Sequence, residues 1–349
     1  MPGPTPSNYS AWITTVDTTI GHLYSQLNPK VTYKEYVTTL PMKGSIYSAG
    51  WTGRMPKARP WFGSRVVHTP APQTYQVEPI PYELTYGIDR FKLEDSDVNG
   101  ESIFWRTLPD MVRQWQMQPE YEIRDLLEAS GVQGGARQLG LDGTANFGLH
   151  YIDIYNPGFN GGGNKLFSGG QYSNDSRGGY VAPTGDTIGG ALGTAQFSSV
   201  LQYMQAIPGE DGETLGVTPD VLLIPLTLQV EANFILKATL LAAPSWGAFS
   251  PLTGQVGTAD NQLAKMGVRP VVNSYLRSPK DWYLFDATHP TAKPLLWIVR
   301  EAPRTVPRIN ENDPIVFDSH RYTWGGWDRV CPAWDYAFLG HKSGPTAGA

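Results

Sequence analysis

The acidic segment 94–101 is the part of the chain whose spacing comes nearest to a metal-binding motif. Asp95, Asp97 and Asn99, followed by a glycine, match the first half of an EF-hand calcium loop. The twelfth position of such a loop needs a bidentate carboxylate, but Arg106 stands there. The same segment suits a helix N-terminus, because Asp97 or Asn99 can cap it and carboxylates favour the positive end of the helix dipole. The sequence therefore predicts a helix start here and no metal site.

Histidine, cysteine and serine side chains could supply metal or nucleophilic chemistry. None of the six histidines pairs with another at ligand spacing, and His150 with Asp153 supplies at most two ligands. Cys331 is the only cysteine, and neither a Gly-x-Ser-x-Gly elbow nor a phosphate-binding glycine loop is present. A Ser-His-Asp triad built from distant positions stays open, because triads are defined by geometry. The sequence predicts no catalytic site, no cofactor and a protein that is not an enzyme.

The elements around the acidic segment favour a structural role. A segment rich in glycine, proline and aromatic residues precedes a run with period-two apolar residues, which predicts an extended ribbon over 46–93. Isolated two-stranded ribbons are marginally stable in water, so this ribbon needs another surface to lie on. We expect a subunit that neighbouring copies complete. The apolar positions of the run are Ile80, Tyr82, Leu84, Tyr86 and Ile88.

Aromatic and basic residues gather in the loop part of this ribbon. The aromatic residues are candidate anchors between subunits, with local packing inside the loop as the alternative. The basic residues are expected to face acidic groups of a neighbouring subunit. The candidate contact residues are Trp51, Trp61 and Phe62, with Arg54, Lys57, Arg59 and Arg65, opposite Glu94, Asp95, Asp97 and Glu101.

The distribution of charge also indicates contacts between copies. The net charge is −5, yet residues 1–69 carry seven Lys and Arg against Asp17 and Glu35. A basic arm on an acidic body favours docking between copies; nucleic-acid binding is the alternative, but the basic residues are spread out. Charged residues make up only 17% of the chain, which suits a surface that partners cover. We find no signal peptide and no membrane-spanning run, and the single cysteine fits a reducing cytoplasm.

Beyond the ribbon, periodicity predicts a long helix over 101–130, which Pro119 should kink or divide. A glycine-rich region, 148–190, has no sustained period. The remaining chain reads as a mixed α/β unit. Helices are predicted from Thr194 and over Leu228 to Leu241, and strands over Val221 to Pro225, Val268 to Tyr275, Trp282 to Asp286, Pro294 to Arg300 and Ile315 to Trp324.

With these residues in view, the chain resembles the major head subunit family of Mu-like tailed phages. Four short motifs, in the same order as in the family, carry the resemblance from about residue 45 onward. They are Gly50-Trp51-Thr52-Gly53-Arg54-Met55-Pro56 with Trp61-Phe62-Gly63; Gly87-Ile88-Asp89-Arg90 leading to Gln118-Pro119-Glu120; Asp142-Gly143-Thr144-Ala145-Asn146-Phe147; and Leu215-Gly216-Val217-Thr218-Pro219-Asp220.

The resemblance implies the α+β Johnson fold of tailed-phage major capsid proteins (Hong Kong 97 type). The implied parts are an N-terminal arm (1–45), an extended loop (46–93), a peripheral domain (94–193) with spine helix 101–130, an axial domain (194–325) and a C-terminal strand and tail (326–349) returning to the peripheral domain. Two features depart from the family: the glycine-rich region is longer than expected, and the N-terminus is too short for a fused scaffolding domain.

The implied function is self-assembly, through hexamers and pentamers, into an icosahedral head shell that encloses DNA without sequence-specific binding. The implied partners are other copies, a separate scaffolding protein, a portal and a decoration protein, with no membrane. The implied location is the virion, assembled in the bacterial host cytoplasm. A carbohydrate-active or tail-associated hydrolase, favoured by the aromatic residues and glycine-rich loops, is the main alternative. A carbohydrate-binding adhesin is the third reading, although this class normally carries an export signal.

Overall fold

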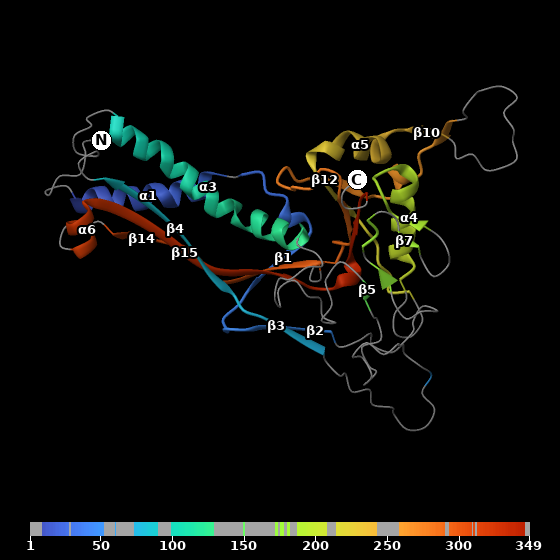
Figure 1. Ribbon diagram of the computed structural model, residues 1–349, viewed down its shortest axis with the longest axis horizontal. Coiled ribbons are helices and arrows are strands. Elements are labelled where there is room, and N and C mark those ends of the chain that lie inside the picture. The colour runs from blue at the N-terminus through green and yellow to red at the C-terminus, as the bar shows by residue number, and fades with distance from the viewer. Residues whose placement is uncertain are drawn as a thin grey trace, which may run out of the picture.

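Two sheets, bridged by one long helix, organise the part of the chain that the structure describes (Figure 1). The structure is a computed structural model. The described residues are 9–27, 29–51, 60, 73–89, 99–128, 149–150, 172–173, 175–177, 180–181, 187–207, 214–242, 258–289, 293–308, 310 and 313–345.

The helices are α1 (Tyr9–Gln26), α3 (Asn99–Glu128), α4 (Thr194–Gln205), α5 (Gln229–Lys237) and α6 (Pro314–Ser319), with the short 3-10 helices η1 (Tyr33–Glu35), η3 (Leu226–Leu228), η4 (Leu263–Lys265) and η5 (Ala337–Leu339). The longer sheets contain β1 (Val37–Pro41), β4 (Ile80–Asp89), β9 (Val221–Ile224), β12 (Arg269–Val272), β13 (Trp282–Phe285), β14 (Leu295–Arg308), β15 (Arg321–Trp334) and β16 (Gly340–Ser343). Two-stranded pairs are β2 (Tyr47–Trp51) with β3 (Gln73–Val77), β5 (Leu149–His150) with β6 (Tyr172–Ser173), β7 (Tyr180–Val181) with β8 (Thr187–Ile188), and β10 (Leu240–Ala242) with β11 (Thr258–Asp260).

The first lobe is built on a long sheet with strand order β1-β14-β15-β4. β14 and β15 are antiparallel, and the register of β14 shifts on either side of Glu301, so that the strand bulges there. Alternate residues of β14 point to opposite faces: Leu295 and Trp297 join the core beneath α3, whereas Leu296 and Ile298 join a cluster on the other side. The long sheet therefore buries apolar side chains on both faces near its β1 end.

Helix α3 runs without interruption from Asn99 to Glu128, two residues earlier at each end than predicted. Pro119 does not divide it. Its first half packs with α1, β4 and β15 through Leu108 and Met111, and its last turns pack on the second sheet. A side chain at Gly326 of β15 would meet the Trp115 ring at 2.8 Å, so glycine is needed for this close approach of helix and sheet.

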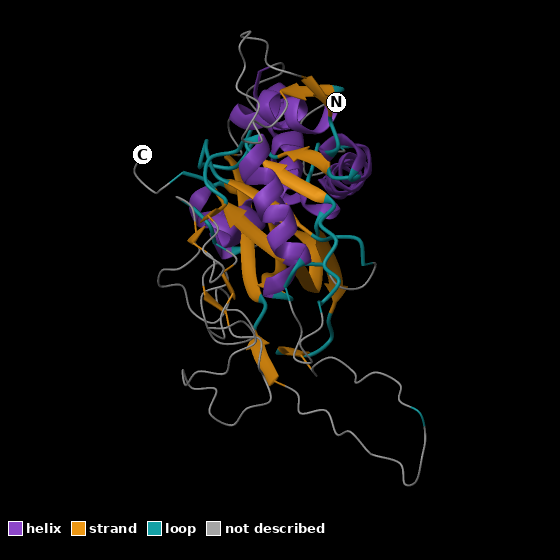
Figure 2. Cartoon of the chain, turned by 90° about the vertical axis from the view of Figure 1, so that its right-hand side faces the viewer, coloured by secondary structure: helices purple, strands orange, loops and turns teal. Residues whose placement is uncertain are grey.

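The second lobe is built on a sheet with strand order β12-β9-β13-β16. Every residue of β9 and β13 is buried, because helices or segments cover both faces. Helices α4 and α5 cover one face, whereas the end of α3 and the segment around Tyr36 cover the other. Figure 2 looks at this lobe end-on, with helices packed against its strands. The predicted strands at 221–225, 268–275 and 282–286 and the predicted helix from Thr194 are confirmed.

Three predictions of local structure were wrong. The period-two run does not pair within the predicted ribbon: β4 pairs with β15 along its whole length, a partner more than 230 residues away in the sequence. The predicted helix over 228–241 ends at Lys237, because the Asn261 side-chain amide bonds to the carbonyls of Ile235 and Ala238, each at 2.8 Å.

The predicted strand over 315–324 is also wrong in its first half. Pro314 occupies the first position of helix α6, where its fixed φ suits a helix and its missing N–H is not needed. His320 then takes a positive φ of 49°, and β15 begins at Arg321. Residues 326–334 continue β15 in the long sheet, whereas β16 pairs with β13 in the second sheet. The last described residues thus contribute to both sheets.

Candidate inter-subunit surfaces and buried polar sites

The root of the predicted contact loop is the β2–β3 pair. Trp51 and Gln73 are opposite each other in this antiparallel pair, so the chain leaves and returns at adjacent positions. Tyr47 and Val77 pair at the other end, and Val77 is buried in a cluster on the face of the long sheet opposite α3. The fold therefore holds the two ends of segment 52–72 together on one face of the first lobe.

A carboxyl group lies beside this root. Asp335 follows β15, and burial raises the pKa of its carboxyl from 3.8 to about 7. The pKa of Tyr47, at the start of β2, is raised by burial and by the negative charge of Asp335. The root of the loop is thus a place where protonation changes the local charge near neutral pH.

The structure locates only part of the predicted contact set. Trp51 is the last residue of β2, and Glu101 is in the first turn of α3. The other predicted contacts lie outside the described residues: Arg54, Lys57, Arg59, Trp61, Phe62 and Arg65 on the basic side, and Glu94, Asp95 and Asp97 on the acidic side.

The basic segment and the acidic segment of the predicted contact are attached to the described part of the chain at different places. The end of β4 and the start of α3, between which the acidic segment lies in the sequence, are at the end of the first lobe marked N in Figure 1. The β2–β3 pair lies at the lower side of the molecule in the same view. These two attachment points lie apart within one chain. Their separation bears on whether the basic and acidic segments meet within a subunit or between subunits.

A buried carboxylate joins the N-terminal segment, α3 and the second sheet. Glu120 is 1% exposed and accepts hydrogen bonds from the backbone N–H groups of Thr32 and Tyr33, at 2.9 and 3.1 Å. It also accepts from the hydroxyl of Thr32 and, at 2.6 Å, from the amide of Asn273 directly after β12. Hydrogen bonds to a charged acceptor are the stronger kind. Glu120 therefore connects these three segments, and we call this group the Glu120 hub.

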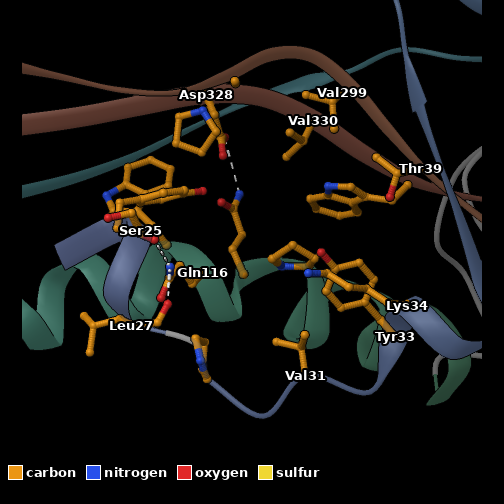
Figure 3. Close-up of a pocket in the computed structure, with 18 residues that line it drawn as sticks. Ser25, Leu27, Val31, Tyr33, Lys34, Thr39, Gln116, Val299, Asp328 and Val330 are labelled. Atoms are coloured by element: carbon orange, nitrogen blue, oxygen red, sulfur yellow. Dashed lines mark hydrogen bonds between the residues drawn. The ribbon is translucent and has the colours of Figure 1, made fainter. Parts of the chain in front are cut away.

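A groove of about 530 Å³ opens between the end of α1, α3 and the bulged part of β14 (Figure 3). Gln116 bridges its helices by donating to the carbonyls of Tyr24 and Leu27, at 2.7 and 2.8 Å. Its walls are mostly apolar, with Val299 and Val330 from the sheet. The groove could accept an apolar side chain or peptide segment.

Asp328 is the one carboxyl group among the residues that line this groove. Asp328 is 1% exposed. Burial raises the pKa of its carboxyl to about 6, and a weak hydrogen bond from Gln118, at 3.4 Å, opposes this rise. Glycoside hydrolysis generally uses two carboxyl groups placed on either side of the bond to be cleaved. The lining of this groove does not supply that pair.

A buried serine and histidine resemble part of a hydrolase site. The Ser176 hydroxyl lies 2.8 Å from Nε2 of His341, the spacing of a nucleophile and its base. However, both residues are 1% exposed, and Nδ1 of His341 has no hydrogen-bond partner among the described residues. Burial lowers the pKa of His341 to about 4, with the charge of Asp175 opposing this shift. The Ser176 hydroxyl also donates a hydrogen bond to the Ser343 hydroxyl, at 3.0 Å. All three side chains are buried at β16, so this cluster satisfies polar groups inside the core.

The described ranges offer neither a metal cluster nor a membrane-spanning helix. Within them, no three His, Cys, Asp or Glu side chains gather closely enough to hold a metal ion. No helix in the described ranges combines the length and apolar character that crossing a bilayer requires. The calcium-like turn at Asp95 and Asp97 lies outside the described residues.

Sequence reasoning missed the Glu120 hub. Glu120 stood inside a motif used for the family resemblance, but its role was not recognised, because acidic side chains on helices usually face water. The available signal was its spacing: Glu120 lies three residues before Ile123 and seven before Leu127, on the helix face predicted to be buried. Its partners Thr32 and Asn273 come from distant segments and gave no local signal.

Comparison with family models identifies the chain over most of its length. A model described as phage capsid protein matches residues 82–334, which is more than half of the chain. A model described as Mu-like prophage major head subunit gpT matches residues 13–150. These matches confirm the resemblance predicted from the sequence. Among curated proteins, no sequence matches the chain.

Comparison with solved structures establishes the fold. The procapsid of bacteriophage JBD30 matches with a TM-score of 0.53 and 20% identity, covering 98% of this chain and 76% of that chain. The JBD30 capsid decorated with minor capsid protein trimers matches with a TM-score of 0.49 and 19% identity, over 72% and 92%. A phage-related protein from Bordetella bronchiseptica RB50 matches with 0.48 and 13%, over 94% and 96%. The predicted Hong Kong 97 type fold is confirmed by the first of these matches.

Proposed function

The chain belongs to the phage capsid protein family and is a structural subunit of a phage head shell, and from this premise we propose that its extended loop clasps a neighbouring copy. In the proposed contact, the basic loop residues Arg54, Lys57, Arg59 and Arg65 of one copy face the acidic residues Glu94, Asp95, Asp97 and Glu101 of the next. Trp51, Trp61 and Phe62 anchor the loop.

The position of the two roots carries this proposal. The β2–β3 pair and the start of α3 lie apart in one chain, so the opposite charges that leave from them are better placed to meet between copies (Figure 1). Each exposed ion pair contributes little, on the order of 0–1 kcal/mol. Closed symmetry repeats the contact around a ring, so the sum can still stabilise a shell.

We also propose the domain roles that the resemblance implies. In this proposal the first lobe, with α3 as spine helix, corresponds to the peripheral domain, and the second lobe corresponds to the axial domain. The bounds then differ from those implied by the resemblance, because β14 (Leu295–Arg308) is in the first lobe and β16 (Gly340–Ser343) is in the second. The N-terminal arm, 1–45, clasps another copy. The resulting shell encloses DNA without reading its sequence, and its assembly in the host cytoplasm involves a separate scaffolding protein, a portal and a decoration protein. The protein carries no enzymatic activity.

Replacing residues 53–71 by a short Gly-Ser linker tests the role of the loop. The change stops short of β3, because Val77 is buried and its loss would disturb the core. We expect a soluble, folded subunit that forms no shells by electron microscopy when co-expressed with its scaffold. Wild-type subunits co-expressed with the same scaffold are the control and should form shells. Intact shells from the 53–71 variant would refute the clasp.

A further inference from the structure

Helix α5 carries apolar side chains on two opposite faces. Its inner face packs into the core of the second lobe through Ile235 and Leu236. On the outer face, Val230 is 83% exposed and Phe234 is 57% exposed. Leu226, in η3 directly before the helix, is 59% exposed. An apolar face of a helix normally packs against another element. The apolar outer face of α5 is therefore uncovered in the isolated chain.

The three exposed residues form one continuous feature. Val230 and Phe234 are four residues apart in α5 and therefore lie on one side of the helix, and Leu226 lies in η3, which directly precedes it. We call them the apolar stripe. Met266, at the end of η4, and Leu240, at the start of β10, are also more than half exposed in the same lobe. Single exposed apolar residues need no explanation, but contiguous ones mark an interaction site.

Helix α4 shows that this exposure is not a general property of the lobe. It covers the same face of the same sheet, and Phe197, Val200, Leu201 and Met204 are buried beneath it. The outer positions of α4 are polar and uncharged: Gln196, Gln202 and Gln205 are exposed. Two helices with equivalent inner faces therefore differ in their outer faces, and only α5 presents an apolar one.

Lys237, three residues after Phe234 on the same side of the helix, ends the stripe, and other charged residues lie near it in the chain. Glu231 and Lys237 are exposed on α5, and Lys265 pairs with Asp260 nearby in the chain, with both side chains about 60% exposed. An apolar centre with a polar rim is the anatomy of a protein–protein interface. The rim carries both signs of charge, as does the chain as a whole, so a different face of another copy can supply charges opposite to those of the rim.

We propose that the apolar stripe is a contact between neighbouring copies, packing against a different face of the next copy so that subunits close into a ring. The proposal rests on the proposed function, because copies of this chain build the shell. A second copy is the occupant that such a shell always supplies. A stripe that packed on itself would give a two-fold dimer and stop, whereas contact with a different face repeats until the ring closes.

The double variant Val230→Gln with Phe234→Gln tests the contact. We expect a folded subunit with an unchanged thermal midpoint, and at least a tenfold loss of rings and shells by sedimentation and electron microscopy. The matched control is Phe317→Gln on α6 in the first lobe, which removes an aromatic side chain that is 72% exposed and should keep assembly. Normal shells from the double variant, or equal loss in both variants, would overturn the assignment.

A thiol placed on the stripe tests the mode of contact. Cys331 is the only cysteine and is buried, so Val230→Cys supplies one accessible thiol. We expect fast maleimide labelling in isolated subunits and at least tenfold slower labelling in shells. Slow labelling in isolated subunits would show that the chain covers its own stripe. Disulfide-linked dimers on mild oxidation would show that the stripe packs on itself. Either result would overturn the proposal.

The wild-type protein separates this inference from the function on which it rests. If wild-type subunits formed no shells with their scaffold present, the proposed function and the stripe contact would both fail. If wild-type subunits formed shells and the stripe variants did too, only the stripe contact would fail.

Discussion

Two candidate contact surfaces of this subunit differ in chemistry and in how they are found. The proposed loop surface pairs basic residues of segment 52–72 with acidic residues of segment 94–101, and these charges are visible in the sequence. The apolar stripe consists of Leu226, Val230 and Phe234, which look like core residues in the sequence. The comparison teaches that a charge pattern suggests a surface contact directly, whereas an apolar contact is recognised only once the core is known.

The two surfaces should also respond to different conditions. Contacts between exposed charges are weakened by salt and fall off within about 10 Å at 0.1 M ionic strength. Burial of apolar area is non-directional and has no charge to screen. The surfaces belong to different lobes, and the Glu120 hub connects those lobes. The position of one contact relative to the other therefore depends on this connection.

The largest expected effect comes from removing that connection. Glu120→Ala leaves the N–H groups of Thr32 and Tyr33 and the amide of Asn273 without their acceptor, at roughly 1–3 kcal/mol for each unsatisfied group. We expect a loss of about 3–5 kcal/mol in the free energy of unfolding, measured by urea denaturation. Asp110→Ala, at an exposed position on the same helix, should change it by less than about 0.5 kcal/mol. Equal stability of the two variants would show that the Glu120 hub does not stabilise the fold.

The next effect separates the two faces of α5. Ile235→Ala removes a side chain that is 1% exposed and should lower the free energy of unfolding by about 2–5 kcal/mol. Val230→Gln, five residues earlier on the outer face, should change it by less than about 0.5 kcal/mol. Thermal or urea unfolding of the isolated subunit measures both. A large loss from Val230→Gln would mean that the stripe is part of the subunit's own core.

A pH effect should appear at the loop root and not at the stripe. The pKa of Asp335 is raised to about 7, so between about pH 4 and pH 7 the folded state holds a proton that the unfolded state has released. Stability should therefore fall as pH rises through this window. One pKa unit corresponds to about 1.4 kcal/mol, and partial exposure reduces the total to about 2–4 kcal/mol.

Asp335→Asn should remove most of this slope and raise the free energy of unfolding at pH 8. The slope that remains belongs to Asp328, whose pKa of about 6 acts in the same direction. Urea titrations at pH 4.5 and pH 8 compare the variant with the wild type. An unchanged slope would show that Asp335 is not the titrating group.

The smallest effect concerns salt. Raising ionic strength from about 0.05 M to about 0.5 M should weaken the loop contact by up to about 1 kcal/mol per subunit pair. Light scattering of assembling subunits would measure the change. A variant with Arg54, Lys57, Arg59 and Arg65 changed to Gln should show no such salt dependence. If this variant kept the dependence of the wild type, the loop charges would not be the source.

Local patterns predicted the elements that a short stretch of chain determines. Helix α4 and strands β9 and β13 lie where apolar runs and turn residues placed them, and the period-two run became β4. The long helix was predicted from apolar spacing to within two residues at each end, although Pro119 did not divide it. These elements depend on burial of one face or both, and the pattern of burial is written in consecutive residues.

Predictions failed where a distant residue decided the outcome. Asn261 ends α5 by bonding to its last carbonyls, and β15 supplies the partner that places β4 in a four-stranded sheet. The candidate site shows the same division. The sequence indicated the charged loop and acidic turn, but neither the groove around Asp328 nor the Glu120 hub, whose parts come from three separate segments.

The sequence by itself determined the family, the fold class and the presence of charged candidate contacts, because ordered motifs, periodicity and charge are all local properties. The tertiary structure alone decided that Glu120 is buried and that Val230 and Phe234 are not. The physical reason is that burial depends on which distant surfaces meet. A carboxylate inside the fold needs donors from several segments, and an apolar helix face stays exposed when no other part of the described chain covers it.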